Sequence, residues 1–364
     1  MRKVFFFAIF MCFLFLPAQA EGGQAESFSE MEAILTDADV PVGLKEMFSA
    51  ILTQNISFSP EKITDALTDA ARSRVQAVSK FLTKAAFFML LTAFFKRLLP
   101  EGRSGKGAVT AIHLIVALSM HSQVRVFFSS AKTAISRILS LVDTLTPMLV
   151  SVIAFTGDAH TSAFITPLGA FVSGSLSAYF QKGALRIVEA LYIMHLASSV
   201  SDMPVGRMMD AVKSLFKWLI GAVMGVFLFF MSTGGSIAGA YDGALVKGLK
   251  FAADSLIPIV GSDIAGKMES ITGSAQLVKS AAGVTGMVAL VSACLFPAMD
   301  IFLAMWGLKI LSALMECASD RETASLIDGF SGIFSLLFSL ILASLCMAIM
   351  YVGVSVGIGR RALF

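Results

Sequence analysis

Charged residues are scarce in this chain, and their scarcity excludes most classes of soluble protein. Only 15% of the 364 residues are Asp, Glu, Lys or Arg, whereas 56% are hydrophobic. A soluble domain covers its surface largely with polar and charged side chains, and this composition supplies too few of them. We therefore expect an integral membrane protein.

The chain also lacks the motifs that carry most catalytic chemistry. None of the four cysteines forms a C-x-x-C pair, and the four histidines have no H-E-x-x-H pattern around them. No P-loop and no G-x-G-x-x-G dinucleotide-binding sequence is present either. We therefore expect no enzyme, no metal site, no cofactor and no nucleic-acid partner.

What the N-terminus does contain is the pattern of a secretion signal. Arg2 and Lys3 precede an apolar run over residues 4–16, and Ala18-Gln19-Ala20 supplies a small-residue cleavage site. This apolar run forms a helix of only about 20 Å, which is shorter than the roughly 30 Å hydrocarbon core of a bilayer. We expect residues 1–20 to be a cleaved signal peptide, which leaves the mature N-terminus outside the cytoplasm.

Residues 21–80 are expected to form a small extracytoplasmic helical segment. Their first half is acidic, and Ser59 followed by Pro60 is typical of the start of a helix. Apolar residues then recur at helical spacing, which predicts an amphipathic helix that lies on the membrane or on the rest of the protein. A partner-binding helix is the alternative interpretation.

From residue 81 onward, apolar runs alternate with short polar breaks. This pattern predicts an all-α, polytopic membrane protein of about seven to nine spans, with membrane helices in two blocks at 81–233 and 280–364. Several runs are shorter than the ~20 residues that a perpendicular helix needs, so half-helices or re-entrant pairs stay open. The candidate spans are 81–99, 108–120, 141–156, 162–180, 184–200, 215–232, 281–297, 298–315 and 332–357.

Residues 234–279, between the two blocks, are too polar to cross a membrane as a whole. Charged residues are spaced among apolar ones, and Leu245, Leu249 and Leu256 fall on one helical stripe. We expect an extracytoplasmic loop made of two amphipathic helices, hinged at residues 257–261.

Charge placement orients these spans, because Lys and Arg in short loops stay on the cytoplasmic side. The cationic loops at 96–106 and 207–213 and the terminal Arg360-Arg361 are placed in the cytoplasm, and the acidic loop at 316–328 is placed outside. Nine crossings satisfy these assignments, with the N-terminus outside and the C-terminus in the cytoplasm. The cationic segment at 125–137 does not fit, and it indicates either an interfacial amphipathic helix or a misplaced span before it.

Gly, Pro and charged residues that interrupt the apolar runs are the candidate structural or conduit positions. Broken helices are tolerated in a membrane where protein or a water-filled cavity satisfies the freed backbone groups, and small residues also let helices pack closely. Arg186 and Glu189 are expected to form an internal ion pair, with a transport site as the alternative. The candidates are Pro147, Gly157, Pro167, Arg186, Glu189, Pro258, Gly261 and Pro297.

Several short motifs, together with the signal and the acidic segment after it, resemble the stage III sporulation protein AE family of endospore-forming bacteria. The resemblance covers most of residues 140–360. Its motifs include Leu145-Thr146-Pro147, Thr166-Pro167-Leu168, Phe216-Lys217-Trp218-Leu219-Ile220-Gly221, Gly283-Val284-Thr285-Gly286 and Cys294-Leu295-Phe296-Pro297.

The resemblance implies a mother-cell membrane protein. Such a protein would contribute to a channel-like complex that joins mother cell and forespore during engulfment and is needed for late forespore gene expression. The implied partners are the other stage III A sporulation proteins and, across the intermembrane space, the forespore stage II Q protein. No catalytic residues follow from it. The residues themselves leave a permease-like transporter of small molecules open, built on the broken helices and the Arg186/Glu189 pair.

Overall fold

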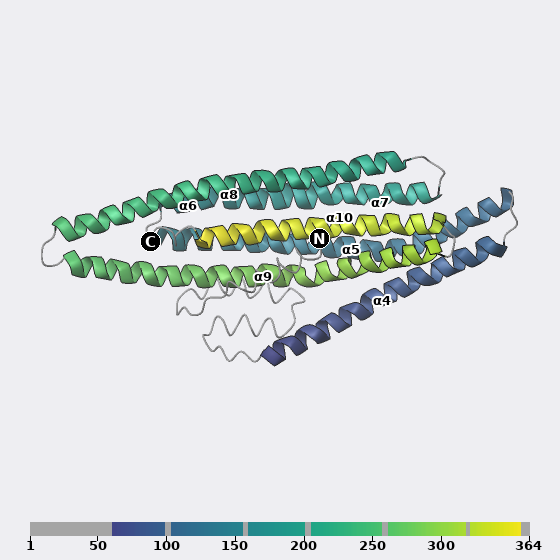
Figure 1. The fold of residues 1–364 in the computed structure, drawn as a ribbon, viewed down its shortest axis with the longest axis horizontal. Helices are drawn as coiled ribbons and strands as arrows, with labels where there is room; N and C mark the ends of the chain where they lie inside the picture. Colours follow the sequence, from purple (N-terminus) through teal and green to yellow (C-terminus); the bar gives the residue numbers. More distant parts are fainter. Residues whose placement is uncertain are drawn as a thin grey trace.

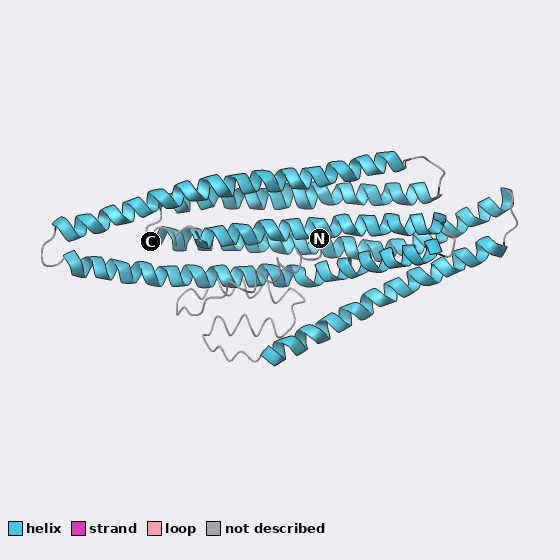
Figure 2. Cartoon of the chain, in the orientation of Figure 1, coloured by secondary structure: helices cyan, strands magenta, loops and turns pink. Residues whose placement is uncertain are grey.

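The computed structural model describes residues 60–98, 103–155, 159–200, 205–256, 261–317 and 321–357, and in these ranges it contains helices and no strand (Figure 2). This confirms the all-α prediction for the described residues. The predicted signal peptide and residues 21–59 lie outside them. The elements are α4 (Pro60–Leu98), α5 (Arg103–Phe155), α6 (Ala159–Gly174), the π-helix η1 (Ser175–Ala184), α7 (Leu185–Val200), α8 (Gly206–Leu256), α9 (Gly261–Cys317) and α10 (Arg321–Gly357).

The start of α4 follows from local sequence. The helix begins at Pro60, as the sequence predicts. Proline suits the first helical position, because its ring fixes φ at a helical value and no intrahelical partner exists there for an N–H group. From this point α4 runs at an angle to the other helices, which lie side by side in an elongated bundle (Figure 1).

The core of the bundle centres on α10, which contacts every other described helix. Phe334 of α10 packs edge-on against Phe127 of α5, with ring centroids 4.9 Å apart. Phe127 in turn meets Phe81 of α4 at 5.4 Å. Edge-to-face aromatic pairs add specific attraction to the apolar burial. These three rings hold α4, α5 and α10 together.

Six helices in the described residues are long and apolar enough to cross a membrane, so the protein is a multi-pass membrane protein. The prediction of seven to nine spans is not confirmed. The six candidate crossings are Arg72–Phe95, Leu118–Ala154, Ser162–Ser198, Gly206–Ser232, Gly283–Cys317 and Glu322–Gly357.

The difference has one physical cause, which is that helices continue where the sequence indicated breaks. The expected spans 281–297 and 298–315 form one helix, because α9 continues through Pro297. α5 likewise contains the expected span 108–120 and all but the last residue of the expected span 141–156, and α6, η1 and α7 follow one another without a gap through the expected spans 162–180 and 184–200. Pro147 and Pro167 lie within α5 and α6. A proline removes one backbone hydrogen bond, and neighbouring helices in a membrane bundle can compensate for that loss without ending the helix.

Fewer crossings also change which connections share a side. α4, α7 and α9 all end, and α5, α8 and α10 all begin, toward one end of the bundle (Figure 1). The cationic loops at 96–106 and 207–213 and the acidic loop at 316–328 therefore lie at the same end, whereas the sequence analysis placed them on opposite sides. The end of α10 lies at the other end of the bundle. An even number of crossings leaves both ends of the described chain on one side, and the orientation expected from the charges would need an odd number.

The long helices exceed the thickness of a bilayer. α9 has 57 residues, which corresponds to about 86 Å against a hydrocarbon core of roughly 30 Å. α8 continues to Leu256 and α9 begins at Gly261. Residues 234–256 and 261–279 are thus the polar ends of two spanning helices, and the proposed division of the chain into domains stays a prediction.

The outward faces carry large apolar side chains, as a lipid-facing surface does. On α8, Trp218, Phe229 and Phe230 are exposed, and on α4 the same holds for Phe87 and Phe94. Lipid tails solvate such side chains at no cost, so their exposure agrees with a membrane environment.

Candidate functional site

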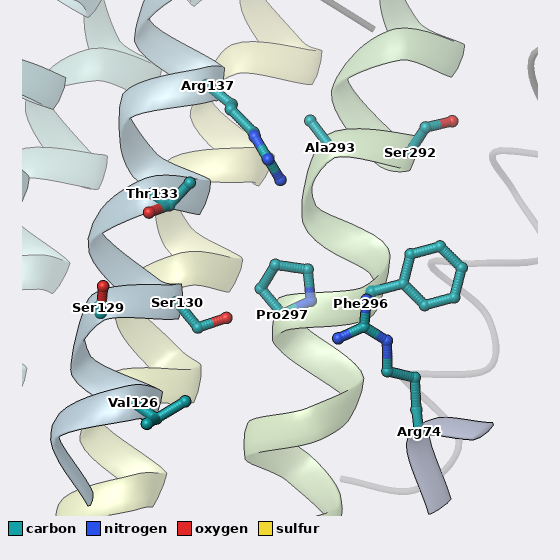
Figure 3. Close-up of a pocket in the computed structure, with 10 residues that line it drawn as sticks. All are labelled: Arg74, Val126, Ser129, Ser130, Thr133, Arg137, Ser292, Ala293, Phe296 and Pro297. Carbon is teal, nitrogen blue, oxygen red and sulfur yellow. The ribbon is translucent and has the colours of Figure 1, made fainter. Parts of the chain in front are cut away.

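A cavity of about 340 Å³ lies between α4, α5 and α9 (Figure 3). It is the candidate functional site, because it combines a concave space with polar and charged side chains inside candidate membrane spans. Its ten lining residues are Arg74, Val126, Ser129, Ser130, Thr133, Arg137, Ser292, Ala293, Phe296 and Pro297.

Helical periodicity places the α5 residues on one wall. Ser130, Thr133 and Arg137 are three and four residues apart, so they fall on one face of the helix. Ser130 and Arg137 extend from α5 toward α9 (Figure 3). Two other cations of this segment, Arg125 and Lys132, are exposed and do not line the cavity.

Pro297 shapes the opposite wall. It has no N–H group, so the carbonyl of Ala293 receives no hydrogen bond from the residue four positions later. Both residues line the cavity. Among the candidate positions that the structure describes, Pro297 is the one that lines this cavity.

Arg74 closes the cavity from α4. Its Nη1 lies 3.3 Å from Asp300 Oδ2 on α9, and its guanidinium carbon lies 5.4 Å from the centre of the Phe296 ring. The second carboxylate oxygen, Asp300 Oδ1, is buried and has no hydrogen-bond partner within the described structure. An arginine stacked on an aromatic ring and paired with a carboxylate is held in a fixed orientation.

The polar part of the lining consists of arginine and hydroxyl side chains. Two of the ten residues are arginines, four carry hydroxyl groups, and none is His, Cys, Asp or Glu. The cavity therefore offers positive charge and hydrogen-bond donors, without a paired nucleophile and base. Across the described ranges, no group of three or more His, Cys, Asp or Glu side chains could hold a metal ion.

The other candidate positions lie elsewhere. Pro147 and Pro167 are exposed within α5 and α6, away from the cavity. Gly261 is the first residue of α9, whereas Gly157 and Pro258 lie outside the described residues. The roles of these positions stay predictions.

Arg186 and Glu189 form an ion pair on the outside of α7. Arg186 Nη1 lies 3.1 Å from Glu189 Oε2, and the two side chains are 73% and 37% exposed. The sequence analysis expected this pair to lie in the bundle interior. The ion pair forms, but both side chains are partly or largely exposed. His195, on the same helix, is buried and bonds through Nε2 to the carbonyl of Leu326 on α10 at 2.7 Å.

Sequence reasoning missed the residues that build the cavity. Arg137 was grouped with Arg125 and Lys132 as one cationic helix, although its spacing from Ser130 and Thr133 separates it from them. That spacing could have predicted that Ser130, Thr133 and Arg137 share one face of the helix. No local pattern could have paired Arg74 with Asp300, because the two residues are 226 positions apart.

Comparison with known proteins identifies the family. The family model described as stage III sporulation protein AE matches residues 42–359. The stage III sporulation protein AE of Bacillus subtilis (strain 168) is 20% identical over 296 residues, which cover 80% of this chain and 74% of that protein. No solved structure matches. The match confirms the resemblance found in the sequence, and the chain belongs to the stage III sporulation protein AE family.

Proposed function

We propose that the protein is an integral membrane component of a channel-like sporulation complex that links mother cell and forespore during engulfment. The observation that carries this proposal is the family match over residues 42–359, which spans all six membrane helices. In this role the protein is not an enzyme, and late forespore gene expression depends on it.

The proposed location is the mother-cell membrane around the forespore. The bundle end that carries the cationic loops at 96–106 and 207–213 faces the mother-cell cytoplasm, because Lys and Arg of short loops stay inside. The cleaved N-terminus and residues 21–71 then lie outside, because the first candidate crossing begins at Arg72. With six crossings the end of α10 also lies outside, whereas an odd number would leave Arg360-Arg361 in the cytoplasm.

The same orientation supports the proposed partners. The polar ends of α8 and α9, at 234–256 and 261–279, extend beyond the membrane into the intermembrane space. There they meet the other stage III A sporulation proteins and the forespore stage II Q protein. Long helices that continue past the bilayer are suited to such contacts, because they carry backbone order from the membrane to the docking surface.

A permease-like transporter is the weaker candidate. That hypothesis used the Arg186/Glu189 pair as a buried substrate site, and the pair is largely exposed on α7. Intramembrane charges that bind substrate face a cavity or the bundle interior.

The test is an in-frame deletion in sporulating cells that carry two reporters, one for early and one for late forespore gene expression. We expect late expression to fail and early expression to persist, and the wild-type gene in trans should restore the late signal. Normal late expression in the deletion strain would refute the proposal.

A further inference from the structure

We propose that the cavity between α4, α5 and α9 binds the anionic group, phosphate or carboxylate, of a small molecule or of a lipid headgroup. Binding at this cavity does not depend on whether the protein joins a channel. The cavity volume of about 340 Å³ falls in the range of ligand pockets, about 300–1,000 Å³.

Charge is the first argument. Two of the ten lining residues are arginines, Arg74 and Arg137, and none of the ten is acidic. Arginine within a membrane span is costly and is found where it faces a cavity or a partner. Its planar fork suits the oxygen pairs of phosphate and carboxylate groups.

Hydroxyl groups give the second argument. A helical Ser or Thr side chain can donate to a carbonyl one turn earlier, as Ser292 does to Val288 at 2.7 Å. Ser130 and Thr133 make no hydrogen bond within the described part of the chain, although both line the cavity. Their hydroxyl groups remain available to a bound anion.

Orientation completes the site. Arg137 and Ser130 extend from α5 into the space in front of α9, and Arg74 approaches the same space beside Phe296 (Figure 3). Donors from two helices therefore converge on one volume. The Asp300 carboxylate pairs with Arg74 and does not itself line the cavity.

The test uses the purified full-length chain in detergent, with two probes that separate the possible sources of the anion. In the lipid arm, equal amounts of phosphatidylglycerol and phosphatidylcholine are added, and native mass spectrometry counts the lipids retained. In the free-anion arm, the unfolding midpoint is compared in inorganic phosphate and in chloride at equal ionic strength. Each arm includes Arg137→Gln, Ser130→Leu and Lys132→Gln.

We expect the parent protein to prefer phosphatidylglycerol, or to be stabilised by phosphate, or both. Arg137→Gln should weaken the effect about tenfold, since a charge-assisted hydrogen bond is lost. Ser130→Leu should also weaken the effect, because the larger side chain fills the cavity. This variant keeps both arginines, so it tests the proposal even if Arg137→Gln does not fold. Lys132→Gln, an exposed cation on the same helix, should match the parent.

Lipid preference would identify a headgroup, and a phosphate effect alone would identify a soluble anion. The proposal is overturned if the parent responds to neither probe. It is also overturned if folded Arg137→Gln and Ser130→Leu respond as the parent does.

Discussion

Arg74 of α4 lies 3.3 Å from Asp300 of α9, and this ion pair joins helices that are far apart in the sequence. The Asp300 side chain is 15% exposed and that of Arg74 is 33% exposed. α4 otherwise diverges from the bundle at this end (Figure 1). The pair therefore fixes the N-terminal part of α4 next to the cavity.

Removing Asp300 should release α4. We expect Asp300→Ala to lower the free energy of unfolding in detergent by about 1–3 kcal/mol, because a part-buried arginine loses its carboxylate. Exchanging the two charges, with Arg74→Asp and Asp300→Arg together, should recover part of the loss. Asp210→Ala is the control, since the Asp210 side chain is 80% exposed and its 3.7 Å contact with Lys213 should contribute less than ~1 kcal/mol. Equal effects of Asp300→Ala and Asp210→Ala would contradict the assignment.

Gly169 marks a close approach of three helices. A Cβ atom there would lie 2.6 Å from both Thr146 Cγ2 of α5 and Tyr351 Oη of α10. Tyr351 donates a hydrogen bond of 2.9 Å to Thr146 Oγ1 at the same place. We expect Gly169→Ala to destabilise the protein by about 1–3 kcal/mol through overpacking.

Gly221 provides the matched comparison for this substitution. A Cβ atom on Gly221 meets nothing within 4 Å, so Gly221→Ala should be neutral or slightly stabilising through helix propensity. Thermal unfolding of both variants in the same detergent gives the answer. A larger loss for Gly221→Ala than for Gly169→Ala would mean that the packing of α5, α6 and α10 differs from that described.

The Arg186/Glu189 pair should matter little to the isolated protein. Because Arg186 is 73% exposed, we expect Glu189→Gln to change the free energy of unfolding in detergent by less than ~1 kcal/mol. Unfolding of the purified variant, beside the parent, measures this. A strong loss of stability would show that the pair is covered, and would return it to the interior position that the sequence suggested.

Sequence analysis was strongest where local chemistry sets the structure. Ser59-Pro60 predicted the start of α4, and the polar run with Pro258 coincides with the interval between α8, which ends at Leu256, and α9, which begins at Gly261. Apolar composition alone predicted a helical membrane protein.

It was weakest where neighbouring helices decide the outcome. Pro147, Pro167 and Pro297 were interpreted as breaks, and each lies within a continuous helix. Whether a helix survives a proline depends on the packing around it, which a single sequence does not contain. The cavity has the same origin, because its arginines come from separate helices and only the tertiary fold brings them together.

In the proposed orientation, the six-span bundle presents the ends of α8 and α9 to the intermembrane space. Alkaline phosphatase, which is active only outside the cytoplasm, can be inserted into the full-length protein at Gly102, Pro258 and Asp320, and fused to the C-terminal Phe364. We expect activity at Pro258 and Phe364 and none at Gly102 and Asp320, with protein amounts compared by immunoblot. Activity at Gly102 and Asp320, or its absence at Pro258, would contradict the six-span orientation.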